Sequence, residues 1–289
     1  MRSLFILIVV FVCIQCTTDH HEIYFDPIQP TVPVTGLQNP VNFQVLRAPE
    51  NSSHVDFSGH SKSDFIALVA EDGKHITAGV LQYFHEDCLP ARFLCFYPKA
   101  DRLTNGIAYF VSDGSSDIIY APVAYAGTIE NPNPDFGFHF QHKMSRIQLS
   151  VRIPEQIEEA GLKVLSAGIF SYDKLSLELG GQRAGELLPE KDAVKTLFPG
   201  RLDNGMIPGN VTLTRDPANL GTVYVFPGED LKLLLQIEGK KGTFASELQL
   251  AAPQAGQTYR ADLVYDPANE MFSASLNDWV QGASFEAQL

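Results

Sequence analysis

Basic side chains are scarce in this sequence, and they never form a run. The 289 residues include 21 Lys and Arg against 34 Asp and Glu, which gives a formal net charge of −13 at pH 7. Nucleic acids are bound through clustered Lys and Arg side chains that neutralise phosphate groups. We therefore expect no nucleic-acid partner, and the acidic excess is typical of a surface that favours solubility.

The sequence also lacks the common catalytic and nucleotide-binding motifs, namely GxSxG, HExxH, the P-loop and GxGxxG. The glycine-rich GGQRAG, residues 180–185, lacks the strand-then-helix setting of a phosphate site, so we interpret it as a turn. HEDC, residues 85–88, has no second cluster at metal-ligand spacing. SDGSSD, residues 112–117, offers too few ordered oxygen donors for a calcium loop and favours a tight turn. We expect no enzyme activity, no cofactor and no metal site.

The sequence also has no apolar run long enough to span a membrane. One short apolar run occurs at the N-terminus. It extends over about nine residues from Leu4 to Val12, against the ~20 that span a bilayer. Together with Arg2 before it, this run indicates an export signal. The signal ends at Cys16, directly before polar TTDHHE, and so resembles a bacterial lipoprotein signal whose cysteine carries the acyl chains. We expect a signal peptide over residues 1–15 and lipidation of Cys16, with plain cleavage as the alternative.

The chain has four cysteines. Cys13 lies within the signal and Cys16 at its end, so the mature chain would contain only Cys88 and Cys95 besides the lipidated residue. Export makes a disulfide between them chemically feasible, because the spacing in HEDCLPARFLC could close a small loop. Cys95 also lies in an apolar, strand-like run, where a buried thiol is the alternative. Both interpretations stay open.

Helical periodicity is rare, and most apolar segments repeat with period two instead. Examples are GIAYFVS, TYRADLVYD and TVYVFPG, and turn residues such as those of SDGSSD and ENPNPD separate such segments. Helix could occur only briefly at 154–161 and 189–197, each behind a proline. About fourteen strand-like segments are too many for one small sandwich, which indicates an all-β chain with two antiparallel β-sandwiches.

Composition also suggests where the domains divide. The turn-rich run 126–137 is the best linker, and the proline-rich stretch 23–40 is typical of a tether. We expect a tether over residues 16–38, an N-terminal sandwich over 39–136 and a C-terminal sandwich over 137–289.

The stretch GFHFQHKMSRIQLSV, residues 137–151, contains two histidines three positions apart. In a strand, residues two apart share a face and residues three apart do not, so His139 and His142 cannot chelate one metal. His142 shares the phenylalanine face, where we expect a core histidine held by a hydrogen bond. Apolar residues then change from even to odd positions near 143–146, which predicts a β-bulge or a passage from one sheet to another.

Four segments, in order, resemble those of the fimbrillin-like proteins of Bacteroidetes. They are an Asp-x-x-Tyr-Ala element, a Phe-x-His-x-x-small-basic-apolar stretch, a Gly-x-x-Tyr strand and a closing apolar-x-Asp-Trp-x-x-Gly. The matching residues are Asp117, Tyr120 and Ala121; Phe140, His142, Ser145, Arg146 and Ile147; Gly256 and Tyr259; and Leu276, Asp278, Trp279 and Gly282. The lipoprotein leader agrees with this resemblance, which covers nearly the whole chain.

The resemblance implies two transthyretin-like β-sandwiches and a role as shaft, tip or anchor subunit of a fimbrium at the outer membrane and cell surface. In such proteins a trypsin-like protease cuts behind the first strand, and a strand from another subunit fills the groove. The resemblance implies that VNFQVL is that strand here and that Arg47, the first basic residue after Arg2, is the processing site. The implied partners are other fimbrial subunits, the outer membrane through the lipid, and a host protein or glycan.

The alternative from a different class is a glycan-binding surface lipoprotein of a nutrient-capture system. Glycan sites usually present exposed aromatic rings, and this chain has ten tyrosines but one tryptophan, Trp279. A β-sandwich hydrolase would need a catalytic motif, and the sequence contains none.

Overall fold

The computed structural model describes most of the chain between Asn42 and Asp278. The described residues are 42–48, 57–59, 65–69, 76–78, 81–84, 88–156, 161–199, 206–239, 242–266 and 271–278. Strands dominate this part, and its only helical element is the 3-10 turn Gly181–Arg183. Within the same ranges, no helix has the length and apolar character needed to cross a membrane. The expected signal peptide 1–15 and tether 16–38, with Cys16, lie outside the described residues.

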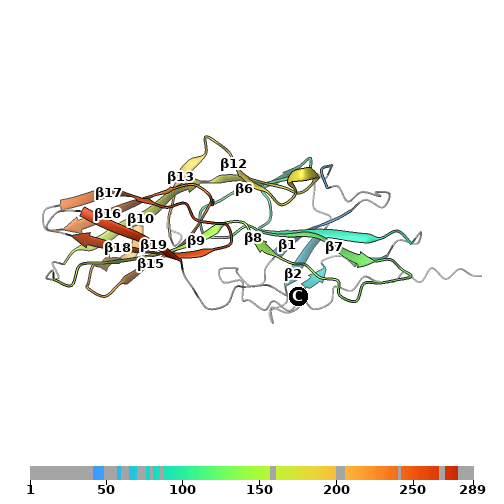
Figure 1. Cartoon of the computed structure of the whole chain (residues 1–289), viewed down its shortest axis with the longest axis horizontal. Coiled ribbons are helices and arrows are strands. Elements are labelled where there is room, and N and C mark those ends of the chain that lie inside the picture. The colour runs from blue at the N-terminus through green and yellow to red at the C-terminus, as the bar shows by residue number, and fades with distance from the viewer. Residues whose placement is uncertain are drawn as a thin grey trace, which may run out of the picture.

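Two sheets form the first sandwich, at the right of Figure 1. The larger has the order β3-β2-β1-β4-β7-β8, and the smaller has the order β12-β11-β6-β5. Strands of the larger sheet are β1 (Asn42–Arg47), β2 (Phe65–Val69), β3 (Ile76–Ala78), β4 (Ala91–Tyr97), β7 (Ile119–Gly127) and β8 (Gln141–His142). Strands of the smaller sheet are β5 (Arg102–Thr104), β6 (Ile107–Val111), β11 (Lys174–Glu178) and β12 (Leu187–Pro189).

Two further sheets form the second sandwich, at the left of Figure 1. One sheet has the order β13-β10-β16-β17, with β14 also paired to β10, and the other has the order β15-β9-β18-β19. Strands of the former are β10 (Lys163–Tyr172), β13 (Val194–Leu197), β14 (Met206–Thr212), β16 (Leu231–Gly239) and β17 (Gly242–Leu250). Strands of the latter are β9 (Ser145–Arg152), β15 (Ala218–Val225), β18 (Thr258–Asp266) and β19 (Met271–Asp278). Pairing is antiparallel except between β9 and β18, which run parallel. The predicted all-β, two-sandwich class is confirmed.

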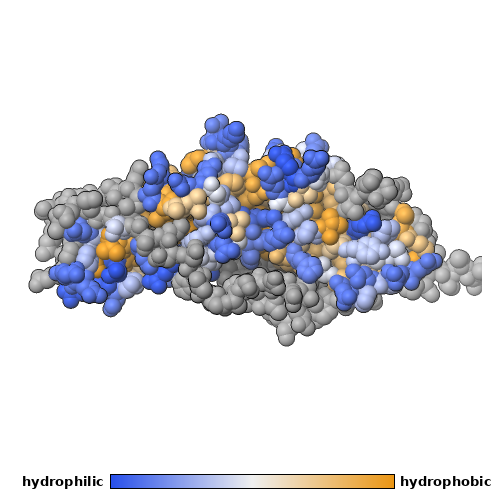
Figure 2. All heavy atoms as spheres, viewed as in Figure 1, coloured by the Kyte–Doolittle hydropathy of each residue, from blue (hydrophilic) through white to orange (hydrophobic). Residues whose placement is uncertain are grey.

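Strand β4 shows why the first sandwich is well packed. Its residues Phe93, Leu94, Cys95 and Phe96 are all buried, although side chains of a strand alternate between faces. Leu94 and Phe96 face the core between the two sheets, whereas Phe93 and Cys95 belong to a second apolar cluster on the outer face of the larger sheet. The larger sheet is therefore covered on both faces. On the face drawn in Figure 2, many of the coloured residues are hydrophilic, with smaller hydrophobic areas between them.

A long hairpin joins the two sandwiches. Strands β10 and β11 are separated only by Asp173, and the returning strands β12 and β13 pair with them in antiparallel register. Between the two pairs, the Asp173 N–H donates to the Ala193 carbonyl at 2.9 Å, and the Ser112 N–H donates to the Asp173 carbonyl. Strands β11 and β12, although late in the chain, thus belong to the smaller sheet of the first sandwich. The predicted domain boundary at 136/137 stays a prediction, and β8, β11 and β12, which follow it in the sequence, belong to the sheets of the first sandwich.

Several local expectations can be compared with the structure. The change of parity near 143–146 marks the passage from β8 in the first sandwich to β9 in the second, as one of the two predicted alternatives requires. The stretch 189–197, considered for helix, instead contains the end of β12 and all of β13. Its β-branched Val194 and Thr196 pair with β10, and tertiary pairing decides such short segments. In the 112–117 turn, Asp113 accepts the Ser115 N–H at 2.8 Å.

Candidate functional site

Strand β1 is the first described element and lies in the middle of its sheet. Asn42–Val45 pair with β2, and Gln44–Arg47 pair with β4, both antiparallel. A strand in this position has hydrogen-bonding neighbours on both sides, and its removal would leave two unpaired edges facing each other. We call the space between β2 and β4 the β1 slot.

One face of β1 points into the core of the first sandwich. Leu46 is fully buried there, in one apolar cluster with Leu94 and Phe96 of β4 and Phe110 of β6. Gln44 shares this face and is 3% exposed. The side chains on this face of β1 thus complete the core of the first sandwich.

The opposite face of β1 is covered by three phenylalanines that lie at the end of the predicted linker 126–137 and directly after it. Phe136, Phe138 and Phe140 form one row, with ring centroids 5.6 and 6.1 Å apart, and we call this row the aromatic strip. Phe136 lies 5.6 Å from Phe93 of β4, while Phe140 stacks on Phe43 of β1 at 4.8 Å. The strip therefore follows β1 along its length, so the β1 slot is closed by two strands, a core and a row of rings.

Arg47, the predicted processing site, ends β1 in a well-held position. Its guanidinium donates to the Tyr83 carbonyl at 2.7 Å and to Gln82 Oε1 at 3.2 Å. It also lies over the Phe93 ring, 5.7 Å from the centroid. The following Ala48 N–H donates to the Arg92 carbonyl at 2.9 Å. The bond after Arg47 thus lies within paired backbone, and a protease needs this end of β1 to open before it can bind the site.

A second polar arrangement lies where the chain leaves the first sandwich. Asp117, which is 5% exposed, is hydrogen-bonded through Oδ2 to Nδ1 of His142, and its Oδ1 accepts the Met144 N–H at 3.2 Å. The hydrogen bond that the Asp117 carboxylate accepts from the His142 ring raises the pKa of His142. Burial raises the pKa of Asp117, although His142 acts in the opposite direction. His142 is 40% exposed, so the expected hydrogen bond is present but the expected burial in the core is wrong.

This arrangement brings together three of the segments on which the family resemblance rests. The Met144 carbonyl, two residues after His142, accepts the Gly256 N–H at 2.9 Å, and Ser145 Oγ donates to the Gln254 carbonyl at 2.7 Å. Gly256 has a φ of +73°, which favours glycine over other residues. Asp117, His142 and Gly256 therefore lie together at the joint between the sandwiches. The sequence had offered them only as separate motifs.

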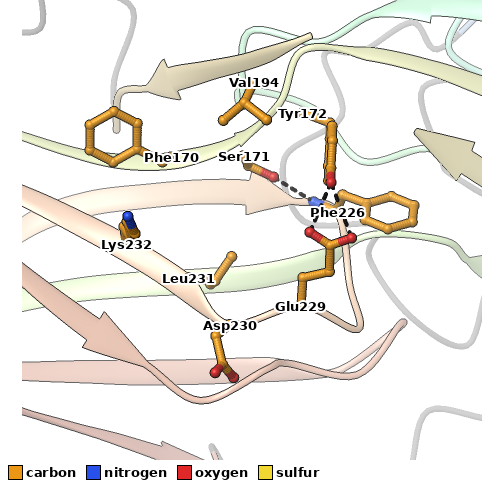
Figure 3. A pocket seen from close by; sticks show the side chains of 9 residues that line it. All are labelled: Phe170, Ser171, Tyr172, Val194, Phe226, Glu229, Asp230, Leu231 and Lys232. Carbon is orange, nitrogen blue, oxygen red and sulfur yellow. Dashed lines mark hydrogen bonds between the residues drawn. The ribbon is translucent and has the colours of Figure 1, made fainter. Parts of the chain in front are cut away.

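An open hollow of about 330 Å³ lies at the end of the second sandwich, between β10, β13 and the loop before β16 (Figure 3). Tyr172 donates to the Glu229 carboxylate at 2.9 Å and packs edge-on against Phe226, with centroids 5.5 Å apart. Asp230 and Lys232 lie beside them. Sequence reasoning missed this hollow because its residues come from separate strands without a shared motif.

The remaining predicted sites are two cysteines. Cys95 is fully buried in β4, and burial raises the pKa of its thiol well above the ordinary value, so a reactive thiolate is disfavoured. Cys88 is half-buried, and both residues are thiols in this structure. The bridge between them stays a prediction. Within the described ranges, no group of three or more His, Cys, Asp or Glu could hold a metal ion.

Comparison with solved structures supports the fold. A candidate cell adhesion protein from Bacteroides uniformis matches with a TM-score of 0.63 and 15% identity, over 92% of this chain and all of that one. A candidate cell adhesion protein from Bacteroides ovatus matches with a TM-score of 0.52 and 14% identity, over 89% and 91% of the two chains. A fimbrial protein from Bacteroides vulgatus matches with a TM-score of 0.50 and 11% identity, over 85% and 95%. No curated protein matches.

The family of the chain follows from its sequence as a whole. The fimbrillin-like family model matches residues 35–279, which include β1, the aromatic strip and the joint between the sandwiches. Because this match covers far more than half of the chain, the resemblance found in four short segments is confirmed. The chain belongs to the fimbrillin-like family.

Proposed function

We propose that this chain is a structural subunit of a cell-surface fimbrium, in which a strand from a neighbouring subunit replaces β1. The observation that carries the proposal is the place of β1, which is early in the chain yet central and buried in its sheet. A cut after Arg47 would separate β1 from all the strands that follow it, so β1 could leave while those strands stay in place. The two edges it leaves are a template for strand addition.

The proposed route begins with export as a lipoprotein through Cys16 to the outer membrane. Cleavage after Arg47 then separates β1 from the rest of the chain, and β1 is exchanged for the partner's strand. A subunit that keeps the lipid and β1 serves as an anchor, whereas one that loses them serves as shaft or tip. The role is structural rather than catalytic, and host contacts are made by the assembled fibre.

Limited proteolysis tests this route. An arginine-specific protease in small amounts is expected to cut the folded precursor first after Arg47, and SDS-resistant ladders should follow. Arg47→Gln should block both the cut and the ladders. N-terminal sequencing starting at Ala48 identifies the cut. A precursor that stays intact at Arg47, or that is cut there and stays monomeric, contradicts the proposal for a shaft subunit.

The contacts of Arg47 predict how fast this cut occurs. Gln82→Ala removes one hydrogen bond from the guanidinium, which typically contributes about 0.5–1.5 kcal/mol. Opening of this end should then become roughly two- to tenfold more frequent, and cleavage after Arg47 faster by the same factor. The matched control is Gln141→Ala, an exposed glutamine on β8 that contacts Lys143 instead. Equal cleavage rates for the Gln82 variant and the parent would show that these contacts do not limit access.

Lipidation of Cys16 has its own test, since Cys16 lies outside the described residues. Cys16→Ala should abolish labelling by a fatty-acid analogue and leave the precursor in the periplasm. Cys13→Ala is the matched control and should be labelled normally. Unchanged labelling of the Cys16 variant would contradict the anchoring step.

The second candidate function, glycan binding at the cell surface, is favoured by the hollow beside Tyr172. It combines half-buried Phe170, Tyr172 and Phe226 with two carboxylates and Lys232, and aromatic faces beside polar groups suit a sugar ring. A protein that is cut after Arg47, stays monomeric and binds oligosaccharides in a Tyr172-dependent manner would favour this candidate over the fimbrium.

A further inference from the structure

We propose that the aromatic strip and the contacts of Arg47 select which strand can enter the β1 slot. An entering strand needs an aromatic side chain at the position of Phe43, a small apolar one at Val45 and a cation, preferably arginine, at Arg47. The occupant is therefore an extended strand of a neighbouring subunit with the pattern aromatic-x-small-apolar-Arg, in which the apolar side chain takes the core position of Leu46. This inference rests on the proposed strand exchange and adds the chemistry that decides the partner.

The position of Phe43 is enclosed by rings that do not belong to β1. Phe140 stacks on Phe43 with centroids 4.8 Å apart and planes at 28°, and Tyr97 of β4 meets it edge-on at 5.9 Å. Phe43 is 2% exposed between them. Phe140 and Tyr97 remain in the subunit when β1 leaves. Each favourable ring pair adds roughly a two- to tenfold preference for an aromatic side chain beyond simple burial.

The middle position accepts only a compact side chain. Val45 is fully buried and lies opposite Cys95, which is also fully buried, within the cluster that includes Phe138. Interiors of this density accommodate extra methylene groups poorly. Valine or alanine fits here, whereas a second large ring does not.

The far end of the slot is formed by groups that suit a guanidinium. The Tyr83 carbonyl, Gln82 Oε1 and the face of Phe93 all contact Arg47, and none of them is part of β1. A planar guanidinium can donate to both oxygens while it lies over a ring, which a lysine ammonium does less well. After cleavage and loss of β1, this end would accept the cation of an entering strand.

The positions of Phe43 and Arg47, at the two ends of the pattern, lie on one face of the strand. Residues 43, 45 and 47 alternate with 44 and 46, which face the sandwich core instead. Along an extended strand the aromatic and cationic positions are separated by roughly 13 Å. The slot therefore selects the register of the entering strand as well as its composition. A shift by one residue would turn the aromatic side chain towards the core face of the sheet.

Peptide exchange on the nicked protein tests the proposal. A specific protease site is inserted between Ala48 and Phe57 in the full chain, the chain is cut there, and fluorescent peptides of residues 40–48 compete for the slot. We expect the Phe43→Leu peptide to occupy the slot about tenfold less than the parent peptide. The Arg47→Gln peptide should lose about threefold to tenfold. A Val45→Phe peptide should not enter.

Variants of the subunit identify which groups discriminate. In a Phe140→Leu subunit the preference for phenylalanine over leucine should shrink to about threefold, because only the Tyr97 contact remains. Tyr97→Leu is the second variant, should Phe140→Leu fail to fold. Phe170→Leu is the matched control, because Phe170 lies on β10 of the second sandwich, away from the β1 slot, and it should leave the preference unchanged.

The outcomes distinguish a failure of the proposed selection from a failure of strand exchange itself. Entry of the parent peptide with equal occupancy by all variants overturns the selection proposed here and leaves strand exchange intact. A preference that persists in both the Phe140 and Tyr97 variants also overturns it. If no peptide, including the parent, enters a folded and nicked subunit, strand exchange itself fails, and the selection fails with it.

Discussion

Leu46→Ala is expected to lower the stability of the precursor by about 2–5 kcal/mol, the usual range for a leucine truncated in a tight core. Leu46 is fully buried and completes the apolar cluster between the two sheets of the first sandwich. Val111→Ala, on a residue that is 63% exposed, should change stability by no more than about 0.5 kcal/mol. Thermal or denaturant unfolding of the purified precursor measures both.

The same substitution has a larger consequence once the chain is cut after Arg47. Strand β1 is then held only by non-covalent contacts, so a loss of about 2 kcal/mol should speed its release by roughly thirtyfold. If β1 is a temporary occupant of its slot, Leu46→Ala should therefore assemble faster than the parent although its precursor is less stable. Release of a labelled β1 and the time course of ladders report the two steps.

Leu233→Ala is the control that separates this effect from general destabilisation. Leu233 of β16 is also fully buried, but in the core of the second sandwich, away from β1. It should lower stability by a similar amount without speeding the release of β1. Equal acceleration by Leu46→Ala and Leu233→Ala would mean that β1 leaves by unfolding of the whole subunit.

Much of this architecture could be predicted from the sequence because period two is a local property. The alternation in TYRADLVYD became β18, with Tyr259, Ala261, Leu263 and Tyr265 all buried. The change of parity near 143–146 likewise predicted a passage between sheets. Such signals depend only on which face of a strand is covered, and the sequence records that residue by residue.

The structural features that the sequence did not predict depend on which distant segments of the chain come into contact. Periodicity placed Phe136, Phe138 and Phe140 on one face but could not show that this face covers β1. The turn-rich run 126–137 suggested a linker, whereas Phe136 within it is buried against the first sandwich. For the same reason the pairing of β11 with β6 could not be found, because strands pair across any sequence distance.

The two-sided cover of the larger sheet bears on the proposed strand exchange. In the intact chain, β1 is covalently attached, and its high local concentration keeps the slot filled. In the proposed cleaved subunit, the aromatic strip, β4 and the smaller sheet would all belong to the remaining chain, so the slot would keep its shape. The joint at Asp117 and the hairpin through β10 and β11 then fix the second sandwich relative to this slot.

Asp117→Ala is expected to cost about 1–3 kcal/mol, because it removes the acceptor of both the Met144 N–H and the His142 ring. Asp113→Ala, in the same turn but at an exposed hydrogen bond, is the matched control and should cost no more than about 0.5 kcal/mol. If both variants unfold alike, Asp117 does not hold the joint. Denaturant unfolding at constant pH makes the comparison.

The same pair predicts how stability depends on pH. Because Asp117 raises the pKa of His142 in the folded chain, the folded state binds this proton more tightly than the unfolded chain does. The stabilisation is fully present below the ordinary histidine pKa of about 6.5 and is lost as pH rises through the higher folded value. The raised pKa of Asp117 gives a change of the same sign in more acidic solution.

The precursor should therefore be more stable near pH 6 than near pH 8.5, a window below the ordinary pKa values of tyrosine and lysine. His142→Gln should flatten this dependence, while His139→Gln, at an exposed residue before β8, keeps the Asp117–His142 pair and is the matched control. A parent protein whose stability rises over this window would contradict the pairing. Since Met144 and Gly256 meet beside this pair, loss of the proton loosens the joint rather than the β1 slot. Peptide exchange in the slot should accordingly keep its selectivity at both pH values.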